Sequence, residues 1–160
     1  MTAEPSFLGG WDRILLSSVA ASLVTFVLIW LKEWLTRQKK HDAFWHAINA
    51  ELMSASELVG TFINDNVAAP LYRLPRSVFD TCYLQLLADG AISPDEIKAL
   101  TAYFNEIETL NRGLDLAAST SDDGERNKQH HHRNRVKAGR LKSSGELYKN
   151  AAAAIAKHIS

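Results

Sequence analysis

The stretch ILLSSVAASLVTFVLIWL occupies residues 14–31 and contains no charged side chain. A helix rises about 1.5 Å per residue, so this stretch would reach about 27 Å, close to the thickness of a bilayer's hydrocarbon core. Trp11, Trp30 and Trp34 lie near its two ends, where aromatic side chains commonly sit at the membrane interface. The pattern predicts a single transmembrane helix over residues 14–31.

The charges on the two sides of this segment predict its orientation. Residues 1–13 contain one base, Arg13, whereas residues 32–41 contain four Lys or Arg. Lys and Arg favour the cytoplasmic side, so we expect an extracytoplasmic N-terminus (1–13), a basic juxtamembrane segment (32–41) and a cytosolic domain (42–160). A cleaved signal peptide fits less well, because residues 1–13 lack a basic cluster.

Residues 42–160 show helical periodicity and no sustained strand-like alternation. The sequence predicts helices over about 42–63, 76–88, 93 to about 111–113, and 126–159. The clearest local signal is SPDE at 93–96, in which Ser93 caps the helix, Pro94 takes its first position and Glu96 completes a capping box. We therefore expect an all-α fold, with one transmembrane helix followed by a cytosolic domain of about four helices.

Several boundaries carry more specific expectations. The helix over about 42–63 either begins at a cap on Asp42 or continues directly from the membrane segment, and Asn64 belongs to the residues expected to end it. Residues 111–113 are expected to loosen the end of the third helix, and residues 117–125 to form a loop. The last helix is continuous unless Gly139 or Gly145 interrupts it, since glycine disfavours helix interiors. Inward-facing residues of the helix over 76–88 are predicted to be Phe79, Cys82, Tyr83, Leu86 and Leu87.

Positive charge is concentrated near the C-terminus, although the whole chain has a formal net charge of zero. Residues 126–142 read RNKQHHHRNRVKAGRLK and contain seven Lys or Arg and no acid. Residues 41–124, in contrast, contain 13 acidic and four basic residues. On a helix, Arg133, Lys137 and Arg140 would share one face. The candidate ligand-binding residues are His130, His132, Arg133, Asn134, Arg135, Lys137, Arg140 and Lys142.

This basic stretch has several possible partners. It could be a solvated face, contact acidic lipid beside the membrane, or pair with the acidic part of its own or another subunit. It could also bind a phosphate-bearing ligand. The three consecutive His residues would point about 100° apart on a helix, which does not suit a shared metal ion.

The sequence contains no glycine-rich phosphate loop, nucleophile elbow or interpretable carboxylate pair. We therefore expect no enzyme activity, no cofactor and no metal, and we interpret Cys82 as a core residue. Within the apolar segment, Ser18, Ser22 and Thr25 provide small residues through which membrane helices could pack closely. A pore would require several chains.

The layout as a whole resembles the small membrane effectors associated with type III CRISPR antiviral defence in bacteria. That resemblance implies a single-pass inner (cytoplasmic) membrane protein, N-out/C-in, that senses a cyclic oligoadenylate such as cyclic tetra-adenylate and perturbs the membrane. It also implies a homo-oligomer, with a tetramer suited to a ring of four phosphates, and no duplex nucleic acid as partner. Basic residues would meet the phosphates, and Asn134 or Tyr148 the adenines.

Other readings remain open. The chain could be a membrane-anchored adaptor or scaffold whose basic helix docks on acidic lipid or on a protein partner. It could also be a small toxin or superinfection-exclusion protein with no ligand. Residues 74–115 are similar to segments of uncharacterised membrane-anchored bacterial proteins, which imply no function.

Overall fold

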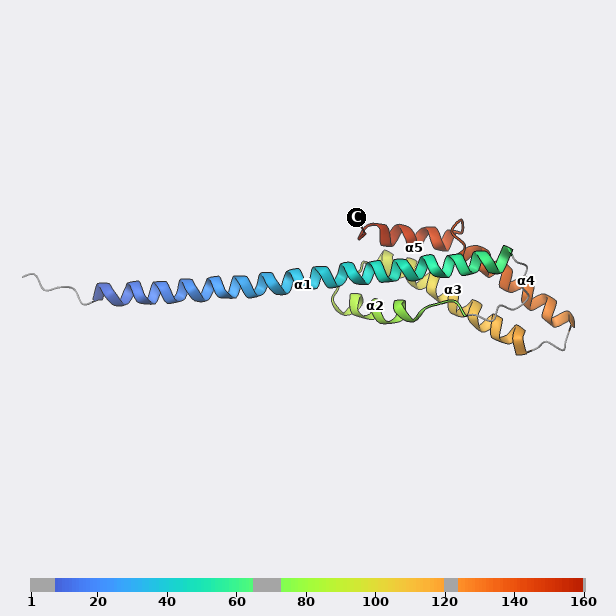
Figure 1. Cartoon of the computed structure of the whole chain (residues 1–160), viewed down its shortest axis with the longest axis horizontal. Helices are drawn as coiled ribbons and strands as arrows, with labels where there is room; N and C mark the ends of the chain where they lie inside the picture. The colour runs from blue at the N-terminus through green and yellow to red at the C-terminus, as the bar shows by residue number, and fades with distance from the viewer. Residues whose placement is uncertain (1–7, 65–72, 120–123, 160) are drawn as a thin grey trace, which may run out of the picture. The chain divides into compact units, whose positions relative to one another are not determined.

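The computed structural model describes the backbone of residues 8–64, 73–119 and 124–159. Within these ranges, the side chains of residues 8–18, 20, 119 and 124–127 are not described. The described residues form helices and no strand, which confirms the all-α class (Figure 1). The elements are α1 (Leu8–Asn64), α2 (Ser77–Ala88), α3 (Pro94–Ser119), α4 (Gly124–Leu141) and α5 (Glu146–Ala156).

The chain divides into two units, Met1–Lys40 and His41–Ser160. Within the part of the chain that is described, no helix combines enough length and apolar character to cross a membrane. The predicted span over residues 14–31 lies partly outside the described side chains, which begin at residue 19. The transmembrane assignment therefore stays a prediction.

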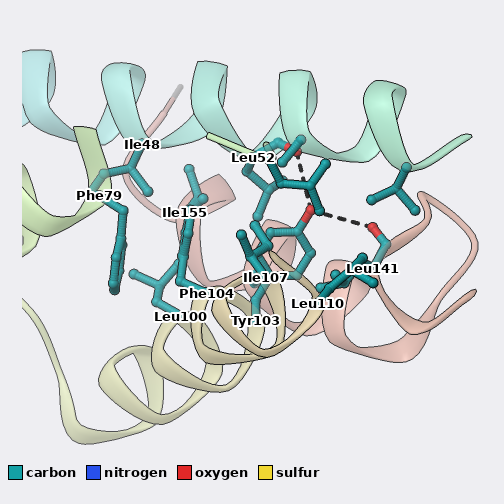
Figure 2. Close-up of a cluster of buried hydrophobic side chains, with 14 of the residues drawn as sticks. Ile48, Leu52, Phe79, Leu100, Tyr103, Phe104, Ile107, Leu110, Leu141 and Ile155 are labelled. Carbon is teal, nitrogen blue, oxygen red and sulfur yellow. Dashed lines mark hydrogen bonds between the residues drawn. The ribbon is translucent and has the colours of Figure 1, made fainter. Parts of the chain in front are cut away.

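The core of the second unit lies between α1 and α3, with α2 and α5 contributing side chains (Figure 2). In Figure 2, Ile48 and Leu52 of α1 extend toward Tyr103 and Phe104 of α3, and Ile155 of α5 lies among them. Apolar residues that recur at steps of three and four in the sequence predict one buried face for this part of α1. That prediction is confirmed, because all six residues are buried: Trp45, Ile48, Leu52, Ala55, Val59 and Phe62.

A carboxylate of α1 caps the beginning of α2. The N-cap residue Arg76 makes no side-chain capping bond. Instead, the backbone N–H groups of Val78 and Phe79 donate to the Glu51 carboxylate at 3.0 and 2.6 Å. Because the first amides of a helix lack internal acceptors, this buried carboxylate satisfies two of them and fixes α2 against α1.

The inward face predicted for α2 is mostly confirmed. Phe79, Cys82 and Leu86 are buried, and Tyr83 is half-buried. The prediction was wrong for Leu87, whose side chain is 38% exposed. The helix ends where predicted, and Gly90 follows with φ of +65°, a conformation that favours glycine.

The capping box at the start of α3 is confirmed. The Ser93 N–H donates to Glu96 Oε2 at 2.8 Å, and the Glu96 N–H donates to Ser93 Oγ at 3.4 Å. Pro94 is the first residue of the helix, as predicted.

The end predicted for α3 was wrong, because the helix continues through residues 111–113 to Ser119. The Asn111 side-chain amide accepts from the Leu74 N–H and donates to the Leu74 C=O, at 2.9 and 3.0 Å. Gly113 provides the close approach to α4, since a Cβ there would come within 3.0 Å of Asn134 Oδ1. These tertiary contacts keep the segment helical although Asn111 and Gly113 have low helix propensity. The predicted loop correspondingly loses residues 117–119 to α3 and 124–125 to α4.

The last segment is interrupted at Gly145 and not at Gly139. Helix α4 ends at Leu141 and α5 begins at Glu146, so residues 126–159 are not one helix. In the turn, the Gly145 N–H donates to the Lys142 C=O at 2.7 Å. A Cβ on Gly145 would lie within 3.0 Å of the Arg140 carbonyl oxygen, whereas one on Gly139, inside α4, would meet nothing.

Candidate anion-binding surface on α4

The predicted ligand-binding residues of α4 lie on different faces of the helix. Its inner face consists of Asn134, Ala138 and Leu141, all buried. With about 100° between neighbours, Arg133, Lys137 and Arg140 lie on one flank and Arg135 on the opposite flank. His132, Arg133, Arg135 and Arg140 are exposed, whereas His130, Lys137 and Lys142 are half-buried.

One flank already faces an acidic side chain. Arg140 Nη1 lies 3.8 Å from Oε1 of Glu106 on α3. That oxygen is buried and, among the described residues, has no hydrogen-bond partner. The contact is therefore an ion pair without a hydrogen bond, and it joins the basic and acidic parts of the chain within one subunit. Among the described residues of α4, it leaves Arg133 and Arg135 as exposed guanidinium groups without an ion-pair partner.

Asn134 points toward α3. Its side chain is 3% exposed, and Gly113 leaves the space that its Oδ1 occupies. Its Nδ2 is buried and lacks a hydrogen-bond partner among the described residues. A contact between Asn134 and a ligand at the outer surface of α4 is not available in this conformation, because α3 covers the side chain.

Lys142 lies beyond the end of α4 and lines a surface hollow of about 360 Å³. Tyr148, the predicted aromatic contact for a ligand, lines the same hollow. The structure thus brings these two residues together in a hollow that Arg133, Arg135 and Arg140 do not line. The remaining lining residues are Met53, Ser56, Glu57, Gly60 and Ser143.

A second polar cluster was missed by the sequence analysis. The rings of Trp45 and His158 are stacked, and His158 Nε2 lies 3.2 Å from Glu96 Oε1. Nearby in the chain, His41 Nε2 lies 3.0 Å from Asp89 Oδ2. Only the capping-box role of Glu96 was visible in the sequence, since the contact with His158 joins residues 62 positions apart.

Metal and thiol chemistry find no support in the described part of the chain. No group of three or more His, Cys, Asp or Glu side chains there could hold a metal ion. Cys82 is buried, as predicted. Burial, together with the nearby charge of Glu51, raises the pKa of its thiol and so disfavours the reactive thiolate.

The small residues of the apolar segment are described in part. Thr25 Oγ1 donates to the Ala21 carbonyl at 2.9 Å, and Ser22 and Thr25 line a shallow depression with Ala21, Phe26 and Ile29. The side chain of Ser18 lies outside the described residues. Packing of these residues against another helix stays a prediction.

Comparison with protein-family models, curated proteins and solved structures finds no match for this chain.

Proposed function

We propose that this protein is a membrane-anchored, non-enzymatic effector whose helical domain binds an anionic ligand. The observation that supports anchoring is the exposed apolar surface over residues 19–35. Its large apolar side chains are each 41–69% exposed: Val19, Leu23, Val24, Phe26, Val27, Leu28, Ile29, Trp30, Leu31, Trp34 and Leu35. An apolar surface this extensive requires a cover, and its overlap with the charge-free stretch 14–31 favours lipid.

The ligand part of the proposal rests on α4. Arg133 and Arg135 are exposed, and neither has an ion-pair partner among the described residues. Guanidinium groups bind phosphates strongly and with defined geometry. The resemblance of the layout to type III CRISPR effectors makes a cyclic oligoadenylate, cyclic tetra-adenylate first, the candidate. The effector would assemble as a homo-oligomer in the bacterial inner membrane, N-out/C-in, and perturb it in antiviral defence.

A binding titration tests this proposal. The full-length chain in a mild detergent would be titrated with cyclic tetra-adenylate, cyclic hexa-adenylate, linear oligoadenylate and ATP. We expect one ring size to bind with a Kd below about 1 μM, and Arg135→Glu to abolish that binding. Lys98→Glu is the matched control, because Lys98 is exposed on α3 and lies outside the basic segment. Equal weak binding of all four compounds would contradict a sensor function.

The second candidate is an adaptor that docks on an anionic surface. The observation that favours it is the distribution of charge on α4, where Arg133 and Arg135 lie on opposite flanks instead of converging on one cavity. A broad surface such as acidic lipid can contact both flanks of one helix. In this case the full-length chain would show no ring preference. Charge reversal at Arg133 or Arg135 would then weaken, in a salt-dependent manner, its recruitment to added vesicles with acidic lipid.

The membrane topology has its own test. A cysteine introduced at residue 2 and one at residue 119 would be labelled in intact cells with a membrane-impermeant maleimide, in a Cys82→Ala background. For the N-out/C-in orientation we expect labelling at residue 2 only. Labelling at residue 119 only would indicate the reverse orientation, and recovery of the chain in the soluble fraction would contradict a membrane anchor.

A further inference from the structure

The hollow that contains Lys142 is built by three parts of the second unit. Helix α1 contributes Met53, Ser56, Glu57 and Gly60, the α4–α5 turn contributes Lys142 and Ser143, and α5 contributes Tyr148. Its volume of about 360 Å³ is at the lower end of the range for small-molecule sites, about 300–1,000 Å³. The hollow is therefore large enough for one small molecule.

One side of the hollow is suited to an anion. Lys142 supplies a cation, and Ser143 supplies a hydroxyl group. The next helix, α5, begins immediately afterwards, and its N-cap residue Gly145 makes no side-chain capping bond. The first amides of a helix lack internal acceptors and carry partial positive charge. Glu146 lies in the same turn but is exposed and does not line the hollow.

Tyr148 and Met53 supply the apolar part of the lining. The Tyr148 ring makes an edge contact with Tyr103, with 6.3 Å between centroids and 68° between planes. Tyr103 is itself held by contacts from its hydroxyl to the backbone oxygens of Leu52 and Leu141, each at 3.4 Å. Tyr148 thus packs against the core while it also lines the hollow. An aromatic ring beside a flexible thioether is a surface that suits a planar ring.

Glu57 and Ser56 complete the lining. An ionised carboxylate only accepts hydrogen bonds, so Glu57 would pair with N–H or O–H donors of a ligand and would repel an anion without donors. Glu57 and Lys142 together thus favour a molecule with an acidic group at one end and a donor on its ring.

We propose that this hollow is a binding site for a small, ring-bearing anion with a hydrogen-bond donor on the ring, of the size of one nucleoside monophosphate. The inference deepens the proposed function and rests on it, in that the anionic ligand would reach beyond the α4 arginines into this hollow. One ring of a larger oligonucleotide would meet Tyr148, and a neighbouring phosphate would meet Lys142.

Gly60 permits a variant that fills the hollow without disturbing the fold. A Cβ at Gly60 would meet no atom within 4 Å, although the residue lines the hollow. Gly60→Gln should therefore place a side chain in the hollow while raising helix propensity. Gly139→Gln is the matched control, because Gly139 is also helical and open but lies on α4 and does not line the hollow. A second pair is Lys142→Met against Lys149→Met, since Lys149 is exposed on α5.

The test uses the full-length chain in a mild detergent, with adenosine monophosphate, adenosine and inorganic phosphate as probes. We expect adenosine monophosphate to bind with a Kd below about 1 mM and at least about tenfold more tightly than the other two probes. Gly60→Gln and Lys142→Met should weaken that binding at least about tenfold, while both control variants retain it. Thermal unfolding of each variant would verify folding.

The outcomes separate this inference from the proposed function. Unchanged binding in Gly60→Gln and Lys142→Met, or no binding of adenosine monophosphate at about 1 mM, would overturn the hollow as a site. If cyclic tetra-adenylate then bound and depended on Arg135 alone, the proposed function would stand without it. Conversely, adenosine monophosphate could bind, with binding weakened by Gly60→Gln and Lys142→Met, while no cyclic oligoadenylate binds. That result would support the hollow as a site and exclude the proposed second messenger.

Discussion

The imidazole ring of His158 lies parallel to the indole ring of Trp45, with 4.1 Å between the ring centroids and 1° between the planes. The contact attaches the turn after α5 to the beginning of the α1 portion in the second unit. The same imidazole faces Glu96 at the start of α3, through Nε2 and Oε1 at 3.2 Å. His158 therefore links α1, through Trp45, to the Glu96 carboxylate of α3, which also closes the capping box with Ser93.

Replacing Glu96 by Ala should cost more stability than removing the cap alone. The change removes the acceptor for the Ser93 N–H and the contact with His158, so we expect a loss of about 2–3 kcal/mol in the free energy of unfolding. Ser93→Ala removes one capping bond and should cost about 1 kcal/mol. Denaturant titrations of the full-length chain in detergent, followed by circular dichroism, would measure both. Equal losses for the two variants would mean that the contacts of Glu96 with His158 and Lys157 contribute nothing.

Glu96 should also make the stability of this domain depend on acidity. Burial raises the pKa of its carboxyl group, but the hydrogen bonds from the Ser93 N–H and hydroxyl, and then His158, outweigh burial and lower the pKa below its ordinary 4.5. A group with a lowered folded-state pKa stabilises the fold above its unfolded pKa, and this contribution disappears as the pH falls through the folded pKa.

The stability difference between the wild-type chain and Glu96→Gln should accordingly be full near pH 7 and shrink below about pH 4.5. The comparison is needed because Glu108, beside Arg112 and Arg76, also has a lowered pKa and is unchanged in both chains. Denaturant titrations from pH 7 to about pH 3 would follow the difference. A difference that stays constant over this range would contradict the assigned role of the Glu96 charge.

Local signals predicted the parts of this fold that depend on neighbours in sequence. The capping box at 93–96 and the apolar face of α1 each involve residues three or four apart, and both are confirmed. The end of α3 was mispredicted because the decisive contacts are distant. Asn111 reaches back 37 residues to Leu74, and Gly113 accommodates Asn134 of α4.

The candidate site shows the same division. The sequence alone could assign Arg133, Lys137 and Arg140 to one flank of a helix, because helical spacing determines this. It could not show that Arg140 faces Glu106, or that Lys142 and Tyr148 share a hollow with α1. The first fact depends on the packing of α4 against α3. The second depends on the turn at Gly145, which brings α5 back onto the other helices.

The two glycines near the end of α4 should respond to alanine in opposite directions. Gly139→Ala adds a methyl group in open space within a helix and should stabilise the domain by about 0.5–1 kcal/mol. Gly145→Ala places the same group against the backbone carbonyl of Arg140, which cannot move without opening the turn, and should destabilise by about 1–3 kcal/mol. Thermal unfolding would compare the two. A stabilising effect at Gly145 would show that α4 and α5 can merge.

Glu51 should be one of the most sensitive polar positions. Replacing it by Ala leaves the buried N–H groups of Val78 and Phe79 without an acceptor, and we expect a loss of about 2–3 kcal/mol. Glu57→Ala, on the same helix but exposed, should change stability by less than about 0.5 kcal/mol. Hydrogen exchange would localise the effect, because the amides of α2 should lose protection first in Glu51→Ala. Uniform loss over all helices would argue against a specific cap.

The contact between Gly113 and Asn134 predicts a double-mutant coupling. Gly113→Ala alone should destabilise the domain by about 1–3 kcal/mol, because its methyl group overlaps Asn134 Oδ1 between two packed helices. Asn134→Ala alone should cost little, since the buried Nδ2 has no hydrogen-bond partner among the described residues to lose. In the Asn134→Ala background the Gly113→Ala penalty should largely disappear, giving a coupling energy of about 1 kcal/mol or more. Additive effects of the two substitutions would mean that the helices relax independently of this contact.

Ligand titration of Asn134→Ala tests whether Asn134 also contacts the ligand. A side chain that only packs against α3 should leave anion binding on α4 unchanged when it is replaced by Ala.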